Sequence, residues 1–106
     1  MINEELKNIT LRLAESLNPE KIYLFGSFAR NEETDESDYD ICILMSDNTK
    51  NISQIYGNAY SAIREVRTRP IDFIIGTKSG FERRKNLPVL ERTIAKEGII
   101  LYERIG

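Results

Sequence analysis

A Gly-Ser pair between two apolar runs, followed at a fixed distance by an Asp-x-Asp motif, is the feature that most constrains this chain. Gly26-Ser27 ends one apolar run, and Asp38-Tyr39-Asp40 opens the next after ten intervening residues. Short apolar runs bounded by turn residues are typical of strands. Because residues two apart on a strand point to the same face, Asp38 and Asp40 are expected to project together.

A third carboxylate, Asp72, lies in the strand-like run PIDFII. A buried unpaired carboxylate is expensive, so we expect Asp72 either at a strand edge or beside a cation. Neighbouring carboxylates repel each other unless a cation intervenes, and Mg²⁺ combines one or two carboxylates with phosphate oxygens. If the strand of Asp72 lies beside that of Asp40, the three acids predict two metal ions about 4 Å apart, an arrangement suited to in-line displacement at phosphorus.

The Gly-Ser turn is suited to holding a phosphate. Gly26 lets the backbone approach a phosphate without a Cβ clash, and Ser27 offers a hydroxyl donor. We predict a short helix over 27–31, whose N-terminus would attract anions, with Arg30 adding a bidentate phosphate contact. A simple turn and a solvated strand end also fit these residues one by one. Their combination indicates a site for a nucleoside triphosphate.

The composition narrows the chemistry. The chain has no histidine, which excludes Ser-His and Cys-His mechanisms. Its one cysteine, Cys42, lies in an apolar strand and is expected to be a small buried residue in a reducing, cytoplasmic setting. No apolar run approaches the roughly 20 residues needed to span a bilayer. The polar, acidic N-terminus is not that of a signal peptide.

The charges are unevenly divided. Residues 1–50 hold 5 Lys/Arg against 11 Asp/Glu, whereas residues 51–106 hold 10 against 6. Because the chain is not basic overall, we do not expect nucleic acid as its principal partner. We expect the basic residues to belong to an anion-lined cleft or to a protein interface.

The periodicity of apolar residues and the turn residues predict alternating helices and strands. This alternation predicts a single domain in which helices pack against a sheet. The expected strands cover residues 21–25, 39–45, 71–75 and 99–103. The expected helices run from an Asn3 cap to an Asn18-Pro19 stop, over 52–68, over 81–86, and from Pro88 to just before Gly98.

The segments GSFAR, SDYDICIL, PIDFII and KEGIILYE together resemble the minimal nucleotidyltransferases of the polymerase-β superfamily. These are the small partners of HEPN-domain toxins in prokaryotic toxin–antitoxin pairs. The resemblance covers nearly the whole chain and implies one α/β (α+β) nucleotidyltransferase domain over 1–106, with a small mixed β-sheet and helices packed against it. The family usually has Gly where this chain has Asn31, a residue that tolerates left-handed backbone.

By this resemblance, Gly26 and Ser27 bind the triphosphate of ATP, Asp38 and Asp40 bind Mg²⁺, and Asp72 completes the catalytic triad. The implied activity is transfer of AMP from ATP to a hydroxyl, a tyrosine of the partner HEPN toxin, by an antitoxin that can form homo- or hetero-oligomers. The core fold uses nearly all residues, so we expect the acceptor to come from another chain. Two alternatives stay open: a catalytically weak nucleotide-binding module that neutralises its partner by direct binding, and transfer to a small-molecule hydroxyl.

Overall fold

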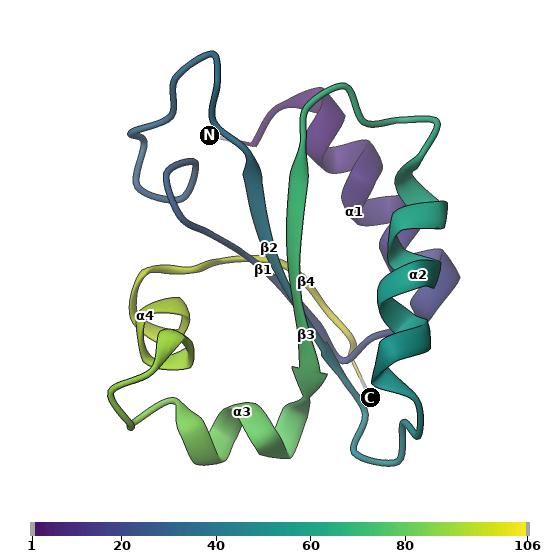
Figure 1. The fold of residues 1–106 in the computed structure, drawn as a ribbon, viewed down its shortest axis with the longest axis vertical. Helices are drawn as coiled ribbons and strands as arrows, with labels where there is room; N and C mark the ends of the chain where they lie inside the picture. Colours follow the sequence, from purple (N-terminus) through teal and green to yellow (C-terminus); the bar gives the residue numbers. More distant parts are fainter. Residues whose placement is uncertain (1, 106) are drawn as a thin grey trace.

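The computed structural model describes residues 2–105 as a four-stranded mixed sheet with helices against both faces (Figure 1). The strands lie in the order β3-β2-β1-β4, with β1 antiparallel to β2 and β4, and β2 parallel to β3. The elements in chain order are α1 (Glu4–Leu17), β1 (Lys21–Phe25), β2 (Tyr39–Met45), α2 (Ile52–Ile63), β3 (Ile71–Thr77), α3 (Lys78–Arg84), α4 (Leu90–Glu97) and β4 (Ile99–Glu103). This architecture confirms the predicted fold class.

Each face of the sheet has its own apolar core. Helices α1 and α2 cover one face, and α3 and α4 lie against the other (Figure 1). The alternation of side chains along β2 divides its residues between the two cores, with Ile41 and Ile43 facing α1 and α2, and Cys42 and Leu44 facing α3 and α4. None of the helices formed by residues 2–105 is long and apolar enough to cross a membrane.

Helix α1 begins and ends as its sequence predicts. The side chain of Asn3 accepts a hydrogen bond from the Leu6 amide at 2.7 Å, and acidic residues occupy the first turn. The helix ends at Asn18, whose left-handed backbone (φ 48°) precedes Pro19.

Three other helix boundaries differ from the prediction. Helix α2 ends at Ile63, because residues 64–66 continue only as turns. Helix α3 begins at Lys78, directly after β3 and before the predicted start at residue 81. Thr77 both ends the strand and caps the helix, accepting a hydrogen bond from the Gly80 amide at 3.2 Å. Pro88 lies outside α4, because Val89 adopts an extended backbone at the N-cap.

We predict that Gly98→Ala destabilises the junction between α4 and β4. A Cβ at Gly98 would lie 2.5 Å from the carbonyl oxygen of Ile94 and 3.1 Å from Tyr23. Overpacking against backbone should lower the free energy of unfolding by roughly 1–3 kcal/mol, measured by thermal and chemical denaturation.

The matched control is Gly57→Ala. Gly57 lies at an exposed position of helix α2, where an added Cβ meets nothing within 4 Å. It should stabilise the protein by up to about 1 kcal/mol through helix propensity. Equal stability of the Gly98 variant and the wild type would contradict the packing argument.

Candidate active site

Two of the three predicted carboxylates lie side by side on parallel strands. Asp40 of β2 is paired in register with Asp72 of β3. Both lie on the sheet face of Cys42 and Ile74, the face toward α3 and α4. Asp40 is half-buried, whereas Asp72 is exposed on an edge strand. Asp72 was expected either at a strand edge or beside a cation, and the structure places it at the strand edge. Because the side chain is exposed there, its charge does not need a cation to offset burial.

Gly26, in the predicted phosphate-binding turn, lies against the Asp40 carboxylate. Phe25 pairs with Asp40 across the antiparallel ladder, which places the next residue, Gly26, against that side chain. A Cβ at Gly26 would lie 2.1 Å from Asp40 Oδ2, and its φ of 75° is left-handed. Both the close approach and the backbone conformation therefore require glycine at this position.

The electrostatics of Asp40 indicate a cluster of like charges. Burial raises the pKa of Asp40, and the negative charges of Asp72 and Asp38 raise it further, with Arg30 opposing them. Among residues 2–105, no three or more His, Cys, Asp or Glu side chains already converge on a common metal position. The carboxylate pair still fits Mg²⁺, which needs only one or two protein oxygens when phosphate oxygens supply others.

The predicted helix over 27–31 is wrong, because the segment forms only one turn. The Ala29 and Arg30 amides donate to the carbonyl of Gly26 at 3.1 and 3.2 Å. Asn31 then adopts a left-handed backbone (φ 59°), a conformation that Asn tolerates, and this ends the turn. Any anion held by Ser27 therefore depends on local donors rather than on a helix dipole.

Arg30, predicted to contact phosphate, forms ion pairs with two glutamates in this structure. Its Nε donates to Glu32 at 2.8 Å, and Nη1 lies 3.9 Å from Glu97 of α4. Its side chain is 43% exposed, and exposed ion pairs contribute little stability, so the guanidinium can exchange partners.

Arg69, which belongs to no motif in the sequence, holds the loop before β2. Its Nη1 donates to the carbonyl oxygens of Ser37 at 2.8 Å, Asp35 at 3.1 Å and Thr34 at 3.2 Å. Its guanidinium also lies 5.0 Å from the Phe28 ring and 5.8 Å from the Tyr39 ring. Arg69 thereby ties the start of β3 to the loop that carries Asp38, and only the folded topology reveals this contact.

Tyr39 fixes the start of β2 from the opposite face. Its ring is buried, and its hydroxyl donates to Glu5 at 2.8 Å. Glu5 also accepts a hydrogen bond from the Thr68 hydroxyl at 2.8 Å. The strand is therefore anchored by the side chain that lies between the two acids in sequence, while Asp38 and Asp40 remain on the other side.

Comparison with known proteins identifies the family. The sequence model of the family "Polymerase beta, Nucleotidyltransferase" matches residues 7–105. The chain belongs to this family. Among curated proteins, no sequence match was found.

Solved structures of similar fold include a candidate nucleotidyltransferase and two toxin–antitoxin structures. One is a candidate nucleotidyltransferase from Sulfolobus solfataricus (TM-score 0.59, 20% identity, 95% of this chain and 79% of that chain). Another is a toxin–antitoxin with AMP-PNP (TM-score 0.59, 24% identity, 92% and 73%). A third is a mutant of the toxin–antitoxin MntA–HpeT with two Asp-to-Glu replacements (TM-score 0.56, 22% identity, 92% and 73%). At these identities the likeness shows a shared fold.

We predict that Asp40→Asn stabilises the protein at pH 7 in the absence of divalent cations. Because the folded-state pKa of Asp40 is raised, its ionisation opposes folding at every pH above that pKa. Below the unfolded-state pKa of about 3.9 the carboxyl is protonated in both states, and the advantage of the variant should vanish. Melting temperatures measured from pH 3 to pH 7 test both limits.

Asp47→Asn is the control with the opposite sign. A hydrogen bond from the Ser79 backbone amide, 2.9 Å long, lowers the pKa of Asp47. Ionised Asp47 therefore stabilises the fold above its unfolded pKa, and its loss should lower the melting temperature at pH 7 but not in acid. If both variants shifted in the same direction, the charge cluster assigned to Asp40 would be wrong.

Proposed function

We propose that this chain is a Mg²⁺-dependent nucleotidyltransferase that transfers AMP from ATP to a hydroxyl of a partner protein, a tyrosine of a HEPN toxin, and so acts as its antitoxin. The observation that carries the proposal is the Asp40–Asp72 pair beside the Gly26 turn. Carboxylates beside a glycine turn suit a metal-bound triphosphate, since they offer oxygen ligands and close backbone approach. The related fold with AMP-PNP and the toxin–antitoxin relatives support this choice of nucleotide and partner.

Each site residue has a role in this reaction. The acceptor oxygen attacks the α-phosphorus of ATP, forming a new P–O bond, while the bond to the bridging oxygen breaks and pyrophosphate leaves; the hydroxyl proton is released to water. When bound, Mg²⁺ neutralises phosphate charge and favours the ionised acceptor. Asp38 and Asp40 would hold the cation that carries the triphosphate, and Asp72 the cation nearest the acceptor. Ser27 and Arg30 would contact phosphate oxygens.

The exposure of Asp72 favours an acceptor presented by another molecule. This carboxylate lies at the edge of the sheet, where a partner can bring its hydroxyl without entering a closed cavity. The second half of the chain carries most of the basic residues, which would speed association with an acidic partner surface in a salt-dependent way. Neutralisation by binding alone, with no transfer, is the alternative that the following experiment separates.

We predict that the co-expressed HEPN partner gains one or more AMP units with the wild-type chain but not with Asp38→Asn/Asp40→Asn. The double replacement removes anionic metal ligands while nearly keeping their shape, so transfer should fall by roughly 10²-fold or more. Intact-mass spectrometry of the partner measures the added mass. A partner that stays unmodified, yet is inhibited equally by the wild type and the double variant, would establish the binding-only alternative.

We predict that Asp72→Asn separates binding from turnover. Because Asp72 lies on a different strand from the Asp-x-Asp motif, the variant should keep most of its affinity for Mg-ATP and lose transfer. Calorimetry with Mg-ATP and a single-turnover transfer assay measure the two effects. Since Asp72 is exposed, we expect little change in stability. Normal transfer by this variant would remove Asp72 from the mechanism.

A further inference from the structure

A cavity lies on the same face of the sheet as the carboxylate pair, one step further along the strands. Asp40 is followed on this face of β2 by Cys42 and Leu44, and their in-register partners on β3 are Ile74 and Gly76. These four residues line a cavity of about 110 Å³. Two residues along a strand span about 6.6 Å, so the cavity begins that far from the Asp40–Asp72 pair.

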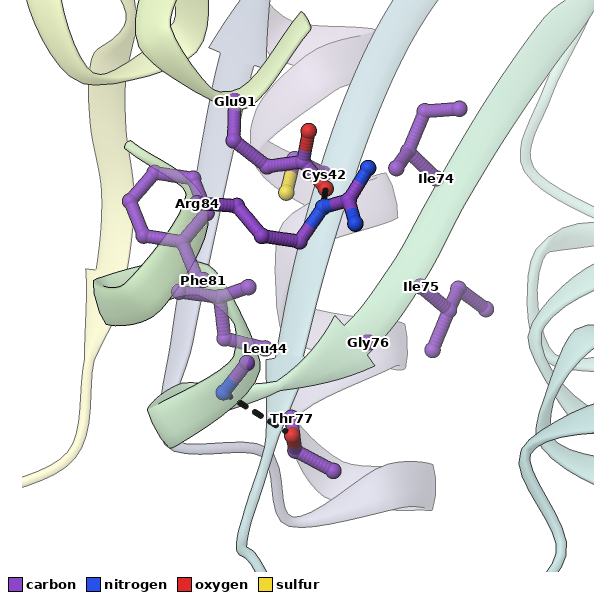
Figure 2. Close-up of a pocket in the computed structure, with 10 residues that line it drawn as sticks. Cys42, Leu44, Ile74, Ile75, Gly76, Thr77, Phe81, Arg84 and Glu91 are labelled. Carbon is purple, nitrogen blue, oxygen red and sulfur yellow. Dashed lines mark hydrogen bonds and ion pairs between the residues drawn. The ribbon is translucent and has the colours of Figure 1, made fainter. Parts of the chain in front are cut away.

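The floor of the cavity is apolar and its rim is polar. Phe81 of α3 adds an aromatic side chain, and its ring stacks on Tyr23 with the centroids 5.6 Å apart. Across the opening, Arg84 Nε donates to Glu91 Oε2 at 2.9 Å, so one ion pair links α3 to α4 above Cys42 (Figure 2). Burial, and then the charge of Glu91, raise the pKa of the Cys42 thiol to about 12, so the thiol is uncharged at neutral pH.

We propose that this cavity receives the nucleobase of the bound nucleotide, an inference that rests on the proposed function. A base has apolar faces and an edge on which hydrogen-bond donors and acceptors alternate, which matches an apolar floor beneath a carboxylate and a guanidinium. In adenine, the exocyclic amino group would donate to Glu91 and the adjacent ring nitrogen would accept from Arg84. The ribose would span the distance between the cavity and an α-phosphate beside the cation that Asp40 would hold.

The polar rim favours a base over the ring of an acceptor tyrosine. A phenol ring in this cavity would direct its only polar group toward the carboxylates and leave the Arg84–Glu91 pair unused. A base uses both members of that pair. Arg84 is 53% exposed, so its side chain has room to adjust as a planar ring enters.

Gly76 provides a way to fill the cavity. It lies on the face of Ile74, lines the cavity, and would accept a Cβ with nothing within 4 Å. Gly76→Val therefore adds bulk where the base would lie, in a strand that suits a β-branched residue. The matched control is Gly57→Val, which adds the same bulk in open space on α2.

The experiment compares Mg-ATP with Mg-tripolyphosphate, which lacks a base, by calorimetry on the full chain. Gly76→Val should weaken Mg-ATP binding about tenfold or more, the scale of losing one base contact, and leave Mg-tripolyphosphate binding unchanged. The control should change neither affinity. Unchanged Mg-ATP affinity in Gly76→Val would overturn the base assignment. So would a loss confined to transfer, which would assign the cavity to the acceptor.

Methyl NMR of the wild-type chain tests the same inference without a variant. Ring currents of the base should shift the Leu44 and Ile74 methyl resonances when Mg-ATP binds, but not when Mg-tripolyphosphate binds, with Ile9 in the opposite core as a reference. Equal shifts with both ligands would overturn the base assignment while leaving the triphosphate site intact. Failure of the wild type to bind either ligand would instead contradict the proposed function, and the base assignment with it.

Discussion

The parallel pairing of β2 with β3 holds two carboxylates beside each other against their mutual repulsion. Like charges directly across a strand pair are destabilising, so the register must be fixed by something else. On the opposite face, Ile41 pairs with Phe73 and Ile43 with Ile75, all buried against α1 and α2. A slip of one residue would turn these apolar side chains out of the core, which makes the register robust. The core therefore maintains the charge cluster on which the proposed function depends.

Arg69 organises the loop beside the site through main-chain contacts. Arg69 donates to main-chain carbonyl oxygens of the loop before β2 rather than to the nearby carboxylates. Its rigid fork suits several acceptors at once, and it stacks on aromatic rings in a way that a lysine would not reproduce. These contacts leave the carboxylates available for the cation of the proposed function.

The sequence predicted those parts of the fold in which local pattern and tertiary packing agree. The four strands, the cap at Asn3 and the helix stop at Asn18-Pro19 followed from residue type and spacing. The helix predicted over 27–31 is wrong, because a polar segment this short forms only a turn that ends at the left-handed Asn31. The contacts of Arg69, the ion pairs of Arg30 and the cavity at Gly76 join segments far apart in the chain, and no local pattern encodes them.

The order of strands in the sheet also governs how the chain acquires its structure during synthesis. Strand β1 can pair with β2 early, because only the turn and one loop separate them, but its other neighbour is β4, near the opposite end of the chain. Until β4 is made, β1 presents an unpaired edge bearing large apolar side chains. Open edges of this kind invite pairing between chains, and contacts distant in sequence form slowly. The interior of the sheet thus stays open to aggregation until its final strand is in place.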